Sequence, residues 1–363
     1  MSRPQRVCLA LVLYGAYFAS AQQSTQVGGA TEASVAAAPK LTTTKVSARS
    51  RMSLDVLVTD GAGKPIGGLE PDDFTIFDNN QPRKVLAFRR TDGTAGNKVD
   101  APVELIIVLD AVNMAYQGVT LMRLQVEKFL RQNDGHLAQP TSVFIFTSDG
   151  MRIQPQPTKD GNALATLIDQ STGTMRSMGT SAGRYGQLEQ FSKSTQTLKT
   201  IAENEARKPG RKMLVWIGSG WPLLAGLFMP TNEAKEQYFA SIIEMSHKLR
   251  EARITVYSIY TLNGSLDKFL YGNFLKGVKT PKQADAGNLA LQVLAVQTGG
   301  RILDSSNDVA GQIANCVGDV GTYYTLVFEA PSALQANEYH DLKVQVSQSG
   351  LMARTNTGYY NQP

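Results

Sequence analysis

The side chains that could carry out covalent catalysis are few in this sequence and far apart. Ser219 lies between two glycines, but Ile217 stands where the Gly-x-Ser-x-Gly turn of serine hydrolases needs its first glycine. The chain has three scattered histidines: His136, His247 and His340. We expect each of them to be a surface residue rather than a general base. The sequence therefore predicts no catalytic residues and no enzyme activity, with a serine hydrolase built on Ser219 as the weakest alternative.

Phosphate-binding and metal-binding motifs are equally weak. The segment 272–280 reads GNFLKGVKT, which comes close to the phosphate-binding P-loop. Val278 displaces the lysine by one place, however, and no strand immediately precedes the first glycine. Two cysteines and three histidines are too few for a zinc site of the Cys and His type. We therefore expect no nucleotide, no metal ion and no other cofactor.

The composition limits the class of protein. At roughly 150 residues per domain, the length of 363 residues suggests about two domains. Hydrophobic residues make up 42% and charged residues 18%, so most of the chain should fold. The formal net charge is only +5 and the basic residues are dispersed, which argues against a nucleic-acid partner.

The amino terminus indicates export. Arg3 and Arg6 precede the apolar run 7–18, and residues 19–21 (Ala-Ser-Ala) are small enough for a signal peptidase. The run is shorter than the roughly 20 residues that span a bilayer. We therefore predict a signal peptide at 1–21, no stable membrane span after its cleavage, and a secreted or periplasmic protein.

Strands and helices should alternate through the middle of the chain. Four apolar runs are typical of strands buried on both faces of a parallel sheet: 103–109, 142–147, 212–217 and 254–260. Stripes of apolar residues with helical spacing lie between these runs. We predict an α/β domain over 102–320, with a doubly wound, mostly parallel sheet.

Shorter β segments should flank this domain. Alternating apolar residues predict one segment at 50–95 and another at 321–363, in a β-sandwich-like arrangement. Each has about three strands, and so short an apolar face is marginal alone, so we expect the two segments to pack together or on the central domain. Residues 22–49 are rich in Gln, Ser, Thr, Ala and Gly, which predicts a disordered lead.

Several short stretches between residues 50 and 360 carry a family resemblance. They are, in order, VLVTDGAGKPIGGLEPDDFTIFDNNQPRKVLAF, VELIIVLDAVNM, PGRKMLVWIGSGWP, LAVQTGGRILDSS, YYTLVF, HDLKVQV and GYY. Their order and spacing resemble those of the von Willebrand factor A-related proteins that are abundant in acidobacteria. The resemblance implies an A domain with β segments before and after it, and it supplies no activity.

A domains are known for a metal-ion-dependent adhesion site, in which an Asp-x-Ser-x-Ser loop, a Thr and a second Asp hold one divalent cation through oxygen atoms. The resemblance places Asp110 at the first position, whereas Val112 and Met114 occupy the two serine positions. Thr180 matches the threonine, and Ser219 stands where the second aspartate belongs. Because valine and methionine offer no oxygen ligand, the resemblance implies a degenerate site without metal. Asp110 is then expected to cap the following helix or to bond loop amides.

The carboxyl edge of an open α/β sheet is where loops converge and ligands bind. We therefore expect Asp110, Asn113, Thr180 and Ser219 to line a partner-binding edge. The sequence predicts an exported, non-enzymatic protein-interaction module whose partner is another protein of unknown identity. A magnesium-dependent adhesin that still uses Asp110 is the main alternative.

Overall fold

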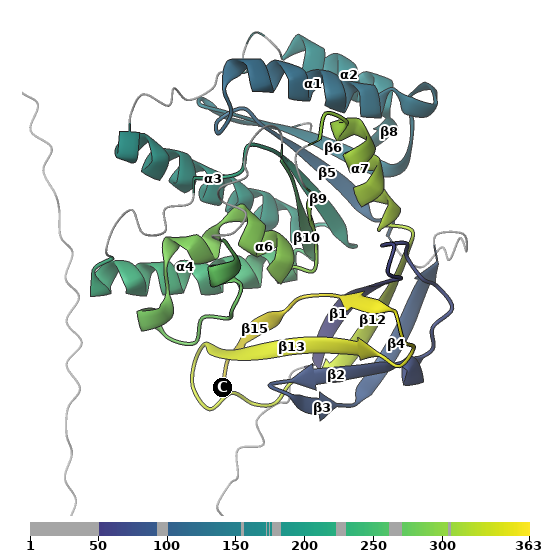
Figure 1. The fold of residues 1–363 in the computed structure, drawn as a ribbon, viewed down its shortest axis with the longest axis vertical. Helices are drawn as coiled ribbons and strands as arrows, with labels where there is room; N and C mark the ends of the chain where they lie inside the picture. Colours follow the sequence, from purple (N-terminus) through teal and green to yellow (C-terminus); the bar gives the residue numbers. More distant parts are fainter. Residues whose placement is uncertain are drawn as a thin grey trace, which may run out of the picture. The chain divides into compact units, whose positions relative to one another are not determined.

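The computed structural model describes most of the chain beyond residue 50 (Figure 1). The described residues are 51–92, 101–153, 156–171, 173, 175, 183–222, 230–260, 271–303 and 306–363. All of them belong to one unit, Ser47–Pro363. The predicted signal peptide at 1–21 and the predicted lead at 22–49 lie outside the described residues.

The middle of the chain forms a seven-stranded sheet with the order β11-β10-β9-β5-β6-β7, in which β8 also pairs with β6. Its strands are β5 (Glu104–Asp110), β6 (His136–Thr147), β7 (Gly150–Ile153), β8 (Thr158–Asp160), β9 (Lys212–Gly218), β10 (Ile254–Tyr260) and β11 (Ile302–Leu303). Every residue of β5, β9 and β10 is buried. This burial explains why these strands read as continuous apolar runs in the sequence.

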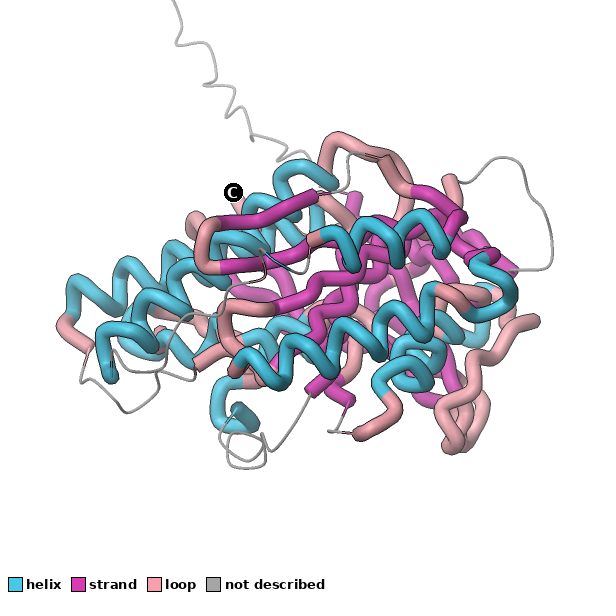
Figure 2. Tube along the Cα trace, turned by 90° about the horizontal axis from the view of Figure 1, so that it is seen from above, coloured by secondary structure: helices cyan, strands magenta, loops and turns pink. Residues whose placement is uncertain are grey.

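Helices cover both faces of this sheet (Figure 2). One face packs against α1 (Tyr116–Leu130), α2 (Gly161–Gln170) and α7 (Val309–Gly318), and the other against α3 (Gly183–Glu205), α4 (Asn232–Glu251) and α6 (Leu291–Gln297). Short 3-10 turns are η1 (Pro71–Asp73), η2 (Gln132–Gly135), η5 (Tyr271–Phe274), η6 (Pro281–Gln283) and η7 (Ala286–Leu289). Successive residues of β5 supply both cores, because side chains alternate across a strand: Ile107 packs with the first set of helices and Val108 with the second.

The two ends of the described chain build two further sheets, each with four antiparallel strands. One has the order β14-β1-β12-β4 and the other the order β15-β13-β2-β3. Their strands are β1 (Arg51–Thr59), β2 (Phe74–Asp78), β3 (Gln81–Arg83), β4 (Val85–Asp92), β12 (Thr322–Glu329), β13 (Glu338–Val346), β14 (Met352–Arg354) and β15 (Gly358–Asn361). Early and late strands are paired in both sheets, since β1 pairs with β12 and β2 with β13. The two terminal β segments therefore fold together, as their shortness predicted.

Both antiparallel sheets contribute side chains to one apolar core. Leu54 and Val56 of β1 and Leu342 and Val344 of β13 belong to it. The intervening residue Lys343 is exposed, so β13 shows the alternation of a strand with one face buried. This period of two made the terminal segments recognisable in the sequence.

The predicted fold class, a doubly wound and mostly parallel sheet of the von Willebrand factor A type, is wrong for this chain. Two of the three sheets are wholly antiparallel, and the third is mixed because β7 and β8 run antiparallel to β6. Ser148 and Asp149 form a two-residue turn after β6, and Gly150 adopts a φ of +122°. The chain thus reverses at once into β7 instead of crossing over to a parallel neighbour. Strands of three or four residues are too short to show a period in the sequence.

Candidate functional site

Asp110 is the last residue of β5, and it is fully buried. Its Oδ2 accepts hydrogen bonds from the indole Nε1 of Trp216 at 2.8 Å and from Nδ2 of Asn113 at 2.7 Å. Its Oδ1 accepts one from the backbone N–H of Asn113 at 3.0 Å. Trp216 lies on β9, the strand next to β5. Donors of the protein itself therefore satisfy both oxygens of the carboxylate.

Burial has the largest influence on this carboxyl group and raises the pKa of Asp110 from 3.8 to about 6. The hydrogen bonds from Asn113 and Trp216 act in the opposite direction, because they stabilise the charged form. At neutral pH the group is therefore mostly ionised although it is buried.

The loop after β5 is tied to helix α3. Nδ2 of Asn113 also donates to Oγ of Ser194 at 2.9 Å, and that hydroxyl donates to the carbonyl of Gln190 at 2.7 Å. Nε2 of Gln190 in turn donates to the carbonyl of Val112 at 3.2 Å. These contacts fix the first half of α3 against the carboxyl end of β5.

Of the two roles expected for Asp110 in the absence of metal, the bond to loop amides is the one that is present. Helix α1 begins at Tyr116, and its N-cap residue is Ala115, which offers no side-chain cap. Asp110 instead bonds the amide of Asn113, two residues before that cap. The aspartate thus stabilises the loop and does not cap the helix.

The predicted site residues are brought together in part. Asp110 and Asn113 are in direct contact. Ser219 is half-buried and follows Gly218, the end of β9, which approaches Asp110 so closely that a Cβ added to Gly218 would stand 2.9 Å from the Cβ of Asp110. Ser219 therefore lies at the same edge of the sheet. Thr180 lies outside the described residues.

Val112 and Met114, which stand where the family resemblance would place serines, are buried in the two cores and not at a shared site. Val112 is fully buried in the core on the α3 side of the sheet, and Met114 is buried in the core on the α1 side. Within the described ranges, no group of three or more His, Cys, Asp or Glu side chains is arranged to hold a metal ion. The carboxylate of Asp110 is thus already hydrogen-bonded within the protein, whereas an adhesion-type cation would need it and several other oxygen atoms as ligands.

The prediction that all three histidines lie at the surface is wrong for His340. His136 is exposed, with its Nδ1 3.3 Å from the carbonyl of Asn133, but His247 is half-buried on α4. His340 is buried on β13. Among the hydrogen bonds of the described residues, none joins a histidine ring to Ser219.

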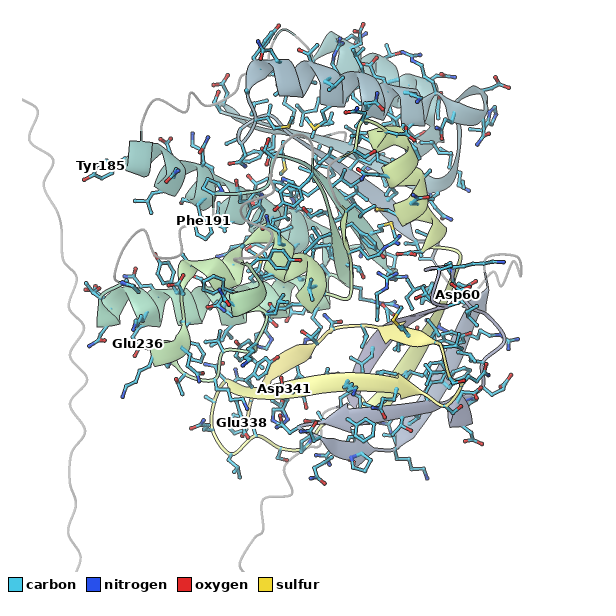
Figure 3. All side chains as sticks on the ribbon, in the orientation of Figure 1. Asp60, Tyr185, Phe191, Glu236, Glu338 and Asp341 are labelled. Carbon is cyan, nitrogen blue, oxygen red and sulfur yellow. The ribbon has the colours of Figure 1, made fainter. Side chains whose placement is uncertain are left out.

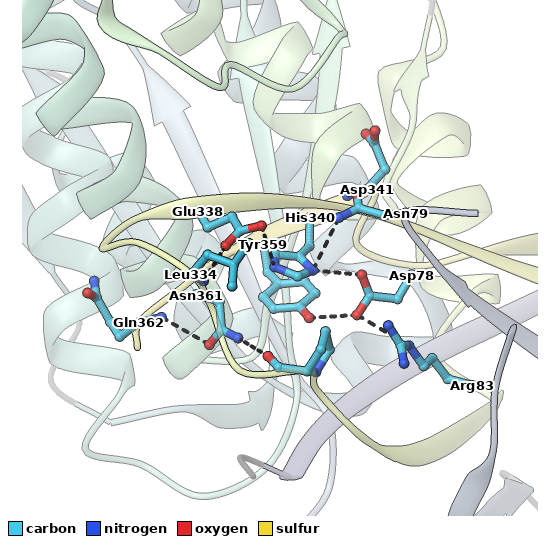
Figure 4. A network of polar contacts seen from close by, with 11 residues as sticks. Asp78, Asn79, Arg83, Leu334, Glu338, His340, Asp341, Tyr359, Asn361 and Gln362 are labelled. Carbon is cyan, nitrogen blue, oxygen red and sulfur yellow. Dashed lines mark hydrogen bonds and ion pairs between the residues drawn. The ribbon is translucent and has the colours of Figure 1, made fainter. Parts of the chain in front are cut away.

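His340 belongs to a second buried polar cluster, which lies within the antiparallel sheet β15-β13-β2-β3 (Figure 4). Its Nδ1 lies 2.7 Å from Oδ1 of Asp78, whose Oδ2 accepts a hydrogen bond from the hydroxyl of Tyr359 at 2.8 Å. The rings of His340 and Tyr359 are stacked with their centroids 4.9 Å apart. The three side chains come from the neighbouring strands β13, β2 and β15, so their bonds join those strands across the sheet. His340 and Asp78 are both buried.

The sequence analysis missed Trp216, Ser194 and Gln190. A buried indole N–H usually bonds an acceptor, so an Asp at the end of one central strand and a Trp near the end of another were a detectable signal. Ser194 and Gln190 lie four and eight residues before the apolar residue Leu198, so all three share one face of α3. This spacing indicates that Ser194 and Gln190 are polar residues on the buried face of the helix.

A groove of about 280 Å³ runs between α3 and α4 beside this network. Its lining is mixed, with Phe191, Tyr238 and Met245 next to Lys199 and Glu244. Nearby, at the amino end of α3, the side chain of Tyr185 is 84% exposed (Figure 3). The helix bonded to the Asp110 loop therefore also presents a hollow surface to the outside.

No protein-family model matches the chain, and no curated protein sequence is significantly similar to it. Among solved structures, the human COPII-coat protein Sec24c is similar over 76% of this chain and 46% of that one, with 10% identity and a TM-score of 0.36. The pilus adhesin SpaC of Lactobacillus rhamnosus GG in its open conformation covers 81% of this chain and 48% of its own, with 9% identity and a TM-score of 0.38. Proximal thread matrix protein 1 of the mussel byssus is similar over 61% of this chain and 48% of that one, with 17% identity and a TM-score of 0.33.

The chain thus spans about half the length of these solved structures, and all three similarities are distant. They do not show membership of the von Willebrand factor A-related family, so that resemblance stays a prediction from short motifs.

Proposed function

We propose that the chain is a non-enzymatic protein-interaction module that binds another protein beside the carboxyl edge of its mixed sheet. The observation that carries this proposal is the groove between α3 and α4, which combines aromatic and methionine side chains with an ion pair between Lys199 and Glu244. Apolar and aromatic surface beside polar groups is the usual make-up of a protein interface. Tyr185 adds a large exposed aromatic side chain on the same helix.

In this proposal Asp110 and Asn113 position the binding surface and do not touch the partner. Asp110 bonds Asn113, and the bond from Asn113 to Ser194 holds the buried side of α3, while other residues of the same helix line the groove. The partner therefore needs no metal ion, and its binding should be unchanged by a chelator. Ser219 lies at this edge as well, and the proposal assigns it no covalent chemistry.

The proposal includes export of the protein, because residues 1–21 have the features of a signal peptide. Among the described residues, no helix is both long enough and apolar enough to cross a membrane. On the basis of the predicted signal peptide, we propose that the mature protein meets its partner in the periplasm or outside the cell.

Affinity capture from the cell's own envelope extract tests the proposal. The mature protein is compared with Ser192→Trp, which fills the groove from an exposed position, and with Ser332→Trp, an equally bulky change at an exposed site in the connection between β12 and β13. The expected result is a partner that both wild type and Ser332→Trp retain, with and without chelator, and that Ser192→Trp loses.

Two outcomes would count against the proposal. Equal capture by all three proteins would place the binding surface elsewhere. Capture that disappears on chelation, and also in Asp110→Ala, would favour the magnesium-dependent adhesin instead.

A further inference from the structure

A groove of about 670 Å³ lies between β13 and β14, two consecutive strands that belong to different sheets. β13, labelled in Figure 1, pairs with β2, whereas β14 pairs with β1. The connecting segment 347–351 therefore passes from one sheet to the other. Among the strand pairings of the described residues, none joins β13 to β14, so each strand turns an edge toward the groove.

The backbone of β13 offers hydrogen-bonding groups on this side. The N–H of Leu342 donates to the carbonyl of Thr357 at 2.9 Å, on the side away from β2, and the N–H of Ser347 donates to the carbonyl of Asp73 at 2.9 Å, on the side of β2. Alternate residues of a strand direct their N–H and C=O groups to the same side. Val344 and Val346 therefore direct theirs away from β2, as Leu342 does, and both line the groove. An edge of this kind is a template for an added strand.

The groove is also positively charged. Its lining includes Arg301, Lys343 and Arg354, and no acidic side chain among the described residues that line it. The buried Asp319 lies behind two of these cations, with its Oδ2 3.1 Å from Nη2 of Arg301 and 2.7 Å from Nη2 of Arg354. One carboxylate balances one of the three cations, which leaves two positive charges in excess at the groove.

We propose that this groove binds an extended, acidic peptide segment of a partner protein, which adds as a strand along β13. The main-chain groups of Val344 and Val346 supply the ladder, and the three cationic side chains select acidic residues in the added strand. This surface is independent of the edge formed by Asp110 and Asn113, so it stands whether or not the groove between α3 and α4 binds a partner.

The chain's own lead does not fit this groove. Residues 22–50 contain one acidic residue, Glu32, and three basic residues, Lys40, Lys45 and Arg49. A segment with a net positive charge is repelled by a groove with an excess of cations. Charge complementarity therefore favours a segment from another protein.

Fluorescence anisotropy with a labelled six-residue peptide of alternating glutamate and valine tests the proposal. The wild type should bind this peptide saturably, and its affinity should fall as salt is added. Lys343→Glu reverses one exposed charge at the groove and should weaken binding about tenfold. Lys84→Glu, the same change at an exposed residue that does not line the groove, should leave the affinity within about twofold of wild type.

A second peptide separates strand addition from simple attraction of charges. N-methylation of alternate residues preserves the sequence and charge but removes the main-chain donors that a ladder needs. The methylated peptide should not bind. Equal binding of the two peptides would overturn strand addition, and equal affinity of wild type and Lys343→Glu would overturn the groove as the site. If the wild type sediments as a dimer and the Lys343→Glu variant as a monomer, the occupant of the groove is instead a second copy of this chain.

Discussion

The indole Nε1 of Trp216 donates to the buried carboxylate of Asp110 across 2.8 Å, and the two residues lie on the neighbouring strands β9 and β5. Asn113 supplies two more hydrogen bonds, one from its backbone and one from its side chain. An aspartate at the carboxyl end of a central strand could hold a cation, but here its acceptor capacity is used inside the protein. Its role is to fix a loop and a helix, and this has measurable consequences.

Trp216→Phe should destabilise the protein more than Trp221→Phe. Both indoles are buried and their rings are in edge contact, with centroids 5.0 Å apart, so the two substitutions remove the same volume from the same core. Trp216→Phe also removes a hydrogen bond to a charged group, and such a bond contributes about 2 kcal/mol to the stability of the folded protein. For Nε1 of Trp221 no hydrogen-bond partner is present in the described structure. Urea denaturation at pH 7 should show the difference, and equal losses of stability would show that the bond contributes nothing.

The stability that Asp110 contributes should fall as the pH rises. Its pKa is about 6 in the folded protein against 3.8 ordinarily, because burial disfavours the charged form. Between these values the folded state binds more protons than the unfolded state, so the contribution is complete below about pH 3.8 and is lost as the pH rises through 6. A difference of about two pKa units corresponds to about 3 kcal/mol.

The measurement is the free energy of unfolding of wild type minus that of Asp110→Asn, taken from pH 4 to pH 7. The subtraction cancels the contributions of groups whose pKa shifts in the opposite direction. One of them is Asp73, whose pKa is lowered by hydrogen bonds from the backbone of Glu70 and the side chain of Ser347. The difference should decrease toward pH 7. A difference that is constant or increases with pH would contradict the assigned environment of Asp110.

The parts of the fold that could be predicted are those in which burial imposes a period on the sequence. β5, β9 and β10 are buried on both faces and read as apolar runs, whereas β13 is buried on one face and alternates. β7 and β8, with four and three residues, impose no period, and the antiparallel pairing of β7 with β6 follows from the turn at Ser148 and Asp149. The two antiparallel strands of the mixed sheet were therefore missed.

The site could be predicted only where one residue determined the outcome. The bond between Asp110 and a loop amide follows from an acidic side chain at the end of a strand. His340 was assigned to the surface because nothing in its local sequence shows that Asp78, more than 250 residues earlier, lies 2.7 Å away. Such a pairing depends on the register of β2 against β13, which a single sequence does not reveal.

Arg253→Lys should lower stability by about 1 kcal/mol. Nε and Nη2 of Arg253 donate to the two oxygens of Asp55 at 3.0 and 2.6 Å, which ties the segment before β10 to β1 of the antiparallel sheet. Lysine keeps the charge but cannot make the paired bonds of a guanidinium. Chemical denaturation measures the loss, with Arg207→Lys at an exposed position of the chain as the control. If the two variants are equally stable, the contact does not hold the β segments to the central sheet.

Magnesium and manganese should give no saturable heat in titration calorimetry at millimolar concentration. An adhesion-type cation needs about six oxygen ligands, several of them fixed by the protein. Val112 and Met114 are buried in opposite cores, and Ser219 offers a hydroxyl where a carboxylate would supply charge. To bind a cation, Asp110 would have to give up its bonds to Trp216 and Asn113, and the free energy of those bonds opposes metal binding. Asp110→Ala is the control: a saturable heat in the wild type that this variant abolishes would show that the loop still forms a metal site, and would make the adhesin the better account of the protein.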